Sequence, residues 1–287
     1  MGSSETVSWY PAAQKESAEL LSFLRSREWS CVSFSSRLIH REGGGNRIFV
    51  NRGDDHRIVE SMLLTAHGLL LPVIQPDLFG PAAYRKELLP LIHAYARTVH
   101  SVMGLDQQVR TIESVLKSQI YERIEYYLMT REYFNIERPQ AEVGSMRFRR
   151  ASGFDVRALF PLQREYEKEE VLLDPDRFNP TASFLSLQKN LRKELVYVAE
   201  IDGVPVAKAG TNARGINYYQ IGGVFTIPEL RGKGIGRAVM SVLMWEIAQK
   251  KKHLCLFVKK SNTAAIKLYS NLGFTLRESY AISYYRA

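Results

Sequence analysis

The chain has few cysteines and no long apolar run, and these two scarcities exclude several classes of protein. Only 2 of its 287 residues are cysteine, and Cys31 and Cys255 lie far apart in apolar surroundings. They predict buried thiols of a reducing cytosol, so neither a disulfide scaffold nor a cysteine-rich metal site is expected. No apolar run reaches the roughly 18 residues that a membrane span needs. We therefore expect a cytoplasmic protein that does not contact the membrane.

Metal and nucleic-acid ligands are also poorly represented. The 6 histidines show no ligand spacing, so we expect no metal. The net charge is +9, but the basic residues form only short clusters, at 147–150, 250–252 and 259–260, without a nucleic-acid-binding motif. A ligand that carries several phosphates would account for part of the excess. We expect no nucleic-acid partner; such a binder is the alternative, and its affinity would fall steeply with salt.

The chain does contain an unusual glycine-rich stretch, RGKGIGRA, at Arg231–Ala238. It follows the strand candidate 221–226 and precedes the helix candidate 239–250. Glycines take alternate positions and basic residues flank them: Arg231, Gly232, Lys233, Gly234, Gly236 and Arg237. Without Cβ atoms, successive backbone N–H groups can converge on an anion, with the positive end of the helix dipole behind them. The stretch predicts a diphosphate-binding loop.

The spacing decides between kinds of phosphate loop. No Ser or Thr follows a Gly-Lys pair, as a Walker loop requires, and the glycines are spaced G-x-G-x-G, unlike a dinucleotide fingerprint. The remaining pattern, R-G-x-G-I-G, resembles the acetyl-CoA pyrophosphate loop of the GCN5-related N-acetyltransferases, the GNAT superfamily. The alternative is a glycine-rich turn that only connects a strand to a helix.

A second motif strengthens this resemblance. The segment Asn262–Phe274 is similar to the family signature N-x-x-A-x-x-L-Y-x-x-x-G-F. Its apolar residues fall at i, i+3, i+4 and i+7 and share one helical face, so Tyr269 points inward. Gly273 would end the helix in a left-handed conformation. A plain core tyrosine is the alternative interpretation of Tyr269.

The resemblance covers about residues 146–287 and implies an α/β (α+β) fold. It would be a GNAT fold, in which helices flank a mixed, mostly antiparallel central sheet, preceded by a second α/β lobe. A polar segment with a proline and a glycine, 136–145, marks the boundary. We therefore predict an N-terminal lobe at residues 1–140 and a GNAT domain at residues 145–287. In the latter we expect a helix that opens at 152–155 and bends at Pro161, a second helix near 181–192, a turn at 212–215 and closing strands at 274–277 and 280–285.

The N-terminal lobe resembles a degenerate copy of the same fold, without a phosphate loop. Its patterns predict helices at 18–25, within 84–103 and at 109–116, and strands at 31–35, 47–51, 60–66, 69–74 and 121–129. We expect this lobe to contribute structure and to bind no second acyl-CoA.

The resemblance also implies roles for individual residues. Phe225 and Thr226 match positions whose backbone holds the cofactor, and Asn262 matches a residue that reaches its arm. The loop residues Arg231 to Arg237, with Ile235 among them, match the pyrophosphate contacts. Gly222 and Gly223 would form a bulge whose free backbone groups face the thioester, and Tyr269 would protonate the leaving CoA thiolate.

No general base can be assigned from the sequence. Some relatives place a glutamate before the bulge, where this chain has Tyr218, Tyr219 and Gln220. An acidic run could attract a cationic amine or be a solvated helix face: Glu165, Glu167, Glu169, Glu170, Asp174 and Asp176.

These features predict an N-acetyltransferase that transfers an acetyl group from acetyl-CoA to a primary amine of a small molecule or peptide. Attack would be direct, in a ternary complex, with no metal. The alternative is a catalytically weak acyl-CoA sensor or scaffold, in which the N-terminal lobe or a partner fills the acceptor cleft. The sequence leaves open the identity of the acceptor and whether the protein forms a homodimer.

Overall fold

The computed structural model describes residues 8–40, 44–77, 79–95, 98–133, 136–140, 142–143 and 145–286, excepting the side chains of 142 and 143. Contacts divide the chain into two compact units. Unit 1 comprises Met1–Met129, Phe257–Thr263 and Leu276–Ala287, and unit 2 comprises Thr130–Leu256 and Ala264–Thr275. The division predicted at residues 140–145 stays a prediction, and residues 141 and 144 lie outside the described part.

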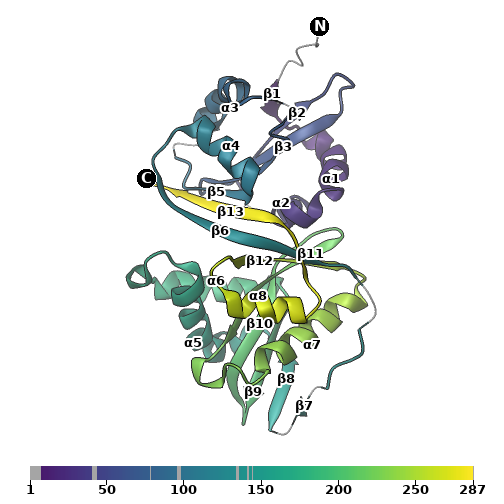
Figure 1. Ribbon diagram of the computed structural model, residues 1–287, viewed down its shortest axis with the longest axis vertical. Coiled ribbons are helices and arrows are strands. Elements are labelled where there is room, and N and C mark those ends of the chain that lie inside the picture. The colour runs from purple at the N-terminus through teal and green to yellow at the C-terminus, as the bar shows by residue number, and fades with distance from the viewer. Residues whose placement is uncertain are drawn as a thin grey trace. The chain divides into compact units, whose positions relative to one another are not determined.

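Unit 1 is built on a mixed, mostly antiparallel sheet (Figure 1). Its strands are β1 (Trp9–Pro11), β2 (Arg47–Arg52), β3 (Ile58–Leu64), β4 (Leu69–Val73), β5 (Ser101–Leu105) and β13 (Thr275–Tyr285). They pair in the order β1-β2-β3-β4-β5-β13, and only β4 and β5 run parallel. The long strand β6 (Ile120–Arg131) follows the last helix of the lobe. The last strand of the chain thus completes the sheet of the unit that holds the first.

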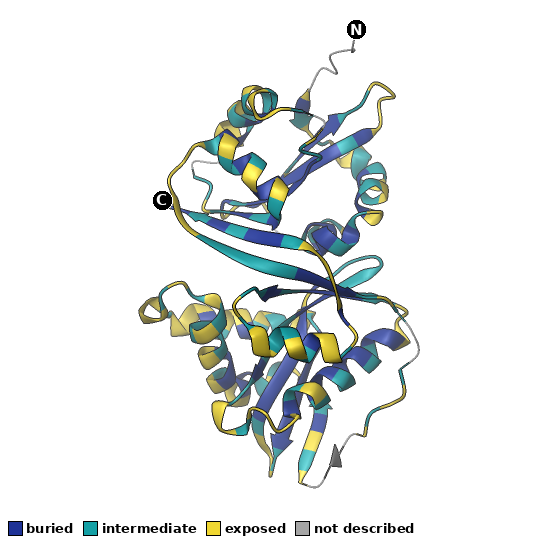
Figure 2. Ribbon diagram, in the orientation of Figure 1, coloured by how far each residue is buried: buried dark blue, intermediate teal, exposed yellow. Residues whose placement is uncertain are grey.

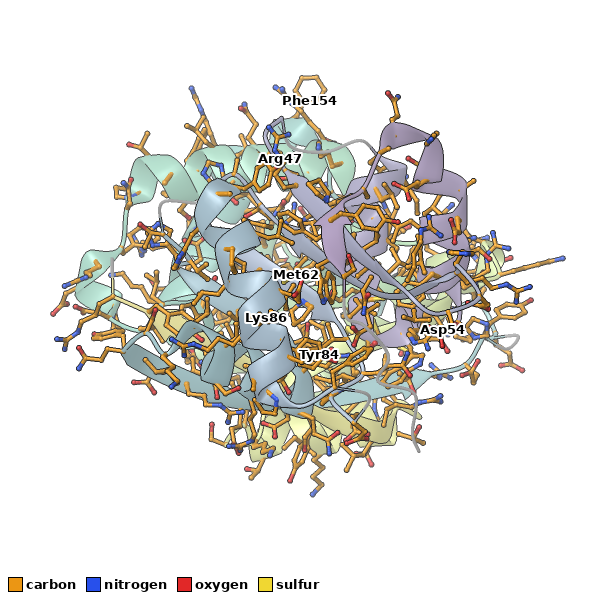
Figure 3. The ribbon with its side chains drawn as sticks, turned by 90° about the horizontal axis from the view of Figure 1, so that it is seen from above. Arg47, Asp54, Met62, Tyr84, Lys86 and Phe154 are labelled. Atoms are coloured by element: carbon orange, nitrogen blue, oxygen red, sulfur yellow. The ribbon has the colours of Figure 1, made fainter. Side chains whose placement is uncertain are left out.

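Helices cover both faces of this sheet. On one face, α1 (Ser17–Arg25) and α2 (Glu28–Ile39) bury Leu20, Leu24 and Phe34. On the other face, α3 (Pro81–Tyr95) and α4 (Asp106–Leu116) form a second core with Met62 and Tyr84. Figure 3 shows both of these side chains within the fold, whereas Phe154 of unit 2 projects from it. The fold class predicted for the chain is confirmed by these layers.

Two predicted elements of unit 1 are wrong. Residues 31–35, predicted as a strand, lie inside α2, which buries Cys31 and Phe34 against the sheet. The predicted helical region 84–103 ends as a helix at Tyr95, and its last residues belong to strand β5. In both places a short apolar stretch fits either a strand or a buried helix, and packing decides.

Unit 2 has the same layered design. Its strands are β7 (Glu142–Val143), β8 (Met146–Arg150), β9 (Val196–Ile201), β10 (Val204–Arg214), β11 (Tyr218–Thr226) and β12 (His253–Lys259). They follow one another in the order β7-β8-β9-β10-β11-β12, and only β11 and β12 run parallel. The 2-residue turn Asp202-Gly203 joins β9 to β10 with positive φ angles of 50° and 79°. This is the hairpin that Asp-Gly predicts.

The helices of unit 2 also divide between the two faces of the sheet. Val196 and Val198 of β9 pack with α5 (Val156–Tyr166) and α6 (Pro180–Lys193). Tyr197, between those valines, donates a hydrogen bond to Glu246 of α7 (Ile235–Gln249), so α7 lies on the opposite face. In Figure 2 the buried residues follow the strands, and the exposed ones lie on the outer sides of these helices. The remaining helix, α8 (Thr263–Asn271), follows β12.

Three boundaries differ from the predictions for this half. Strand β10 continues to Arg214, through most of the turn predicted at 212–215, because a bulge accommodates Asn212. Helix α7 begins at Ile235, four residues before its predicted start. The two closing strands are one continuous strand, β13, because no glycine or proline interrupts it. Within the described residues, no helix is long and apolar enough to cross a membrane.

Candidate functional site

The site begins where two parallel strands stop pairing. Strand β11 pairs with β12 over only four residue pairs, from Tyr218 with His253 to Ile221 with Leu256. Beyond Ile221, β11 continues to Thr226 and pairs with β10 alone. The backbone groups on the other edge of 222–226 therefore have no strand partner in unit 2. This is the kind of strand opening that the family resemblance implies for the cofactor arm.

Two glycines shape this opening. The register between β10 and β11 shifts between Lys208–Phe225 and Gly210–Gly222, where β11 has one residue more than β10. Gly223 lies in that bulge with a φ of 62°, a conformation that side chains rarely adopt. A Cβ on Gly222 would lie 1.9 Å from the Asn212 side chain. The backbone conformation thus favours glycine at 223, a side chain at 222 would displace that of Asn212, and the bulge expected here is present.

The glycine-rich loop has the conformation that anion binding needs. Gly232 and Gly234 have φ angles of 75° and 82°, and an added Cβ would meet no atom within 4 Å at either. Gly234 is the N-cap of α7, and Ile235 is buried beneath the first turn. Within the described part of the chain, no hydrogen bond uses the backbone N–H groups of residues 232–237. Several donors at the positive end of a 15-residue helix are therefore available to a ligand.

The basic residues of the loop differ in their contacts with the rest of the protein. Arg231 donates from Nε to the Thr226 carbonyl oxygen at 3.0 Å and pairs with Glu169 at 2.7 Å. Its guanidinium also lies 5.3 Å from the centre of the Phe225 ring. Lys233 and Arg237 are exposed on the loop and on the first turn of α7. Arg231 thus fastens the loop to the end of β11, while Lys233 and Arg237 face solvent.

The predicted leaving-group acid is buried near a second tyrosine. Tyr269 of α8 is 8% exposed, and its ring packs edge-on against Phe274, with centres 6.0 Å apart. Burial raises its pKa, and the neighbouring Tyr166 and Glu170 raise it further. Gly273 follows α8 with a φ of 82°, the left-handed conformation predicted for the end of that helix. Tyr269 is therefore protonated throughout the neutral range, as an acid must be.

The sequence analysis missed two residues beside the bulge. Lys208 of β10 is only 4% exposed, and its ammonium nitrogen donates to the Gly223 carbonyl oxygen at 3.0 Å. That nitrogen lies 4.5 Å from the centre of the Tyr166 ring. Tyr166 ends α5, and its ring also packs edge-on against Phe225. Burial raises the pKa of Tyr166 to about 12, although the backbone N–H of Gly223 lowers it.

The acidic run is divided between this site and the surface. Glu167, Glu169 and Glu170 lie in the single π-helical turn that follows α5, and such turns are frequent at functional sites. Glu169 forms an ion pair with Arg231, and the charge of Glu170 raises the pKa of Tyr269. Glu165 and Asp174 instead pair with neighbouring arginines on the surface. Recognition of an amine by the whole run stays a prediction.

Unit 1 repeats the element order but fills the equivalent opening. Strands β4 and β5 also pair in parallel over only two residue pairs, from Leu69 to Leu70 on β4. The carbonyl oxygen of Ile74, just beyond β4, accepts a hydrogen bond from the Gln108 side chain at 2.8 Å. The backbone N–H of Gln75 donates to Glu60, and its carbonyl oxygen accepts from Tyr84. In unit 1, side chains thus satisfy the backbone groups just beyond β4, and the absence of a second acyl-CoA stays a prediction.

Three further observations concern what the site does and does not include. Asn262 belongs to unit 1 by its contacts, so its predicted approach to the cofactor stays a prediction. A shallow apolar hollow of about 280 Å³ lies on α5 and α6 and includes none of the loop residues; it is lined by Phe160, Pro180, Thr181, Phe184 and Leu185. The described residues contain no group of three or more potential metal ligands.

Known proteins resemble this chain in sequence and in fold. Residues 158–274 match the family model described as the acetyltransferase (GNAT) family. A mycothiol acetyltransferase from Acidothermus cellulolyticus is 31% identical over 103 residues, which are 34% of this chain and 31% of that protein. The matched region therefore spans about a third of the length of that relative.

Solved structures extend the similarity to the whole chain. A protein from Drosophila superposes with a TM-score of 0.70 at 13% identity, covering 98% of each chain. A tandem GNAT protein from the clavulanic acid biosynthesis pathway superposes with a TM-score of 0.59 at 12% identity, covering 96% of this chain and 97% of that one. At these identities the likeness concerns the fold alone, and it supports the two-lobed arrangement.

Proposed function

The C-terminal half of this chain contains a domain of the acetyltransferase (GNAT) family, and we propose that the protein transfers an acetyl group from acetyl-CoA to a primary amine. The observation that carries this proposal is the opened end of β11 beside a loop whose N–H groups have no partner. A diphosphate bound at residues 232–237 would place the rest of an extended cofactor along the free edge of 222–226. The thioester would then meet the bulge at Gly223.

The residues around the bulge supply the chemistry of direct transfer. The amine attacks the thioester carbonyl carbon, and the charge that develops on oxygen needs a hydrogen-bond donor. Free backbone N–H groups of the bulged strand can donate to it. When the carbon–sulfur bond breaks, the thiolate takes a proton from Tyr269, whose hydroxyl is uncharged at neutral pH. No covalent enzyme intermediate is required, since the amine and the thioester meet in one complex.

The proposal specifies the acceptor only by its chemical class. The Acidothermus relative is named a mycothiol acetyltransferase, but only a third of its length is matched, so its name does not identify the acceptor of this chain. We propose a small molecule or peptide with a primary amine, bound on the side of the site that Tyr166 and the acidic turn line. Residues 232–237 would hold acetyl-CoA, and no metal would take part.

Two measurements test the function separately. Isothermal titration calorimetry with CoA and acetyl-CoA tests the cofactor site, and Gly234→Ala should weaken binding at least tenfold. Release of free thiol from acetyl-CoA, measured against a panel of amino sugars, polyamines, amino acids and peptides, tests transfer. If CoA binds but no amine accelerates thiol release, the protein is an acyl-CoA sensor. If neither CoA nor acetyl-CoA produces heat with the folded protein, the proposal is refuted.

A further inference from the structure

The position of Lys208 is unusual for a lysine. Its side chain extends from the middle of β10 into the layer between the sheet and α5, where residues of that type are almost never found unless they are paired. Within the described residues, no carboxylate lies at ion-pair distance from its nitrogen. Its single recorded hydrogen bond goes to the carbonyl oxygen of Gly223, the bulge residue itself.

A purely structural role does not explain this arrangement. The third strand of unit 1 also buries an ionisable group, Glu60, which is 0% exposed. Glu60 accepts hydrogen bonds from Gln75, Tyr84 and Asn51, as a buried charge in a stable core normally does. Lys208 instead donates one hydrogen bond, to a backbone carbonyl oxygen, and its nitrogen otherwise lies 4.5 Å from the centre of the Tyr166 ring. Such a group is expensive to bury and is typical of functional sites.

We propose that Lys208 is the general base that removes a proton from the acceptor ammonium before it attacks the thioester. The proposal rests on the proposed N-acetyltransferase activity and supplies the group that the sequence could not assign. The nitrogen of Lys208 is hydrogen-bonded to the bulge residue Gly223 and lies over the ring of Tyr166. The nitrogen of Lys208 therefore lies close to the place where the amine and the thioester are proposed to meet.

Burial favours the neutral form of Lys208, and the charged groups around it do not reverse this effect. Burial lowers the pKa of Lys208 to about 7, and the charge of Glu167 opposes this shift. The other titratable groups around the bulge are Tyr166 on α5, Glu170 on the acidic turn and Tyr269 on α8. Neither tyrosine is ionised at neutral pH, so neither can act as the base, whereas a neutral Lys208 can.

The proton inventory of the reaction then balances. The acceptor R–NH₃⁺ gives one proton to the lone pair of Lys208, and R–NH₂ forms the new carbon–nitrogen bond. The carbon–sulfur bond breaks with its electron pair on sulfur, and Tyr269 protonates the thiolate. Tyr269 recovers its proton from the nitrogen of the new amide, and Lys208 releases its own to water. The net products are the amide, CoA thiol and one proton.

The test compares acceptors that do and do not need a base. The wild type, Lys208→Met and Lys208→Arg are assayed with acetyl-CoA and the best alkylamine of the panel. The same acceptor in a weakly basic form, such as its hydrazine or aromatic amine analogue, is already neutral at the assay pH. We expect Lys208→Met to lower kcat with the alkylamine about 100-fold and with the weakly basic analogue less than about 5-fold. The acidic limb of the kcat–pH profile should also disappear.

The controls separate this role from others. Arginine keeps a charge but never becomes neutral, so Lys208→Arg should be as impaired as Lys208→Met with the alkylamine. If it is active, or if both acceptors lose activity equally, Lys208 stabilises charge or structure and the proposal is overturned. An acetyl group found on Lys208 itself by mass spectrometry would also overturn it. A wild type that binds CoA but accepts no amine would refute the proposed function, and this proposal with it.

Discussion

Replacing Lys208 by methionine should make the folded protein more stable at neutral pH, and by an amount that depends on pH. The side chain is buried, and its pKa falls from the ordinary 10.5 to about 7 on folding. Below pH 7 both folded and unfolded chains carry the proton, and the folded state bears the full cost of the buried charge. Between pH 7 and 10.5 only the unfolded chain keeps the proton, so the stability of the wild type rises with pH.

The expected magnitude follows from the same shift. Each pH unit inside that window adds about 1.4 kcal/mol to the free energy of unfolding. Lys208→Met has no such dependence, so its advantage should shrink by about 3 kcal/mol between about pH 6 and about pH 9. Loss of the hydrogen bond to Gly223 offsets roughly 1 kcal/mol of the gain at every pH.

Urea unfolding followed by circular dichroism over this pH range measures the difference. Lys189→Met, which removes an exposed lysine from α6, is the matched control and should show a difference that does not vary with pH. A wild-type stability that stays parallel to that of Lys208→Met across the range would mean that Lys208 titrates normally. The burial argument, and with it the base role, would then be refuted.

Three other substitutions probe separate parts of the molecule. Gly234→Ala places a Cβ at a φ of 82°, which costs about 1–2 kcal/mol and should weaken CoA binding in calorimetry; unchanged affinity would mean that the loop is not the cradle. Tyr269→Phe should leave the Kd for CoA unchanged and lower kcat about 100-fold, measured as thiol release; full activity would make Tyr269 a core residue only. Ala281→Asp puts a charge at a fully buried position of β13 opposite Gly104, and hydrogen exchange should accelerate in β4 and β5 but not in β8 and β9.

The conformation of the glycine-rich loop was predictable because its signal is local. A glycine-rich turn between a strand and a helix fixes the conformation of 231–238 without help from distant parts of the chain. The positive φ angles of Gly232, Gly234 and Gly273 all fall where the motifs require them. The bulge was predictable for the same reason, since two consecutive glycines in a strand usually mark one.

The elements that were predicted incorrectly depend on packing. Residues 31–35 have the alternation of a strand, but α2 buries Cys31 and Phe34 from consecutive turns of a helix. The end of the region 84–103 contains apolar residues that suit either state, and pairing of Val102 with Leu70 and Ser283 of neighbouring strands makes it β5. Neither partner is near in sequence, so no local pattern could decide.

Lys208 could not be found from the sequence for a related reason. In Val204–Ala209 a polar residue between apolar ones predicts a strand with one solvated face, and lysine is the ordinary occupant of such a face. Its burial depends on Tyr166, more than 40 residues earlier, and on the bulge 15 residues later. The sequence pattern therefore predicts the strand correctly, but it does not show which residues cover this face of the strand.

The two lobes show how the same order of elements can leave backbone groups available to a ligand in one place and not in the other. Both open a pair of parallel strands, and an opening exposes backbone groups that water, protein or ligand must satisfy. In unit 1 the side chains of Gln108 and Tyr84 satisfy them, and that opening needs no ligand. In unit 2 the carbonyl oxygens of Gly223 and Thr226 accept from side chains, and among the described residues the backbone N–H groups of 232–237 are left for a ligand. Replacing Gln108 by alanine should therefore loosen unit 1 by about 1–3 kcal/mol without creating a second site, because calorimetry should still give one CoA per chain. If two CoA molecules bound per chain, the Gln108 side chain, and not the lack of a glycine-rich loop, would be what prevents CoA binding to unit 1.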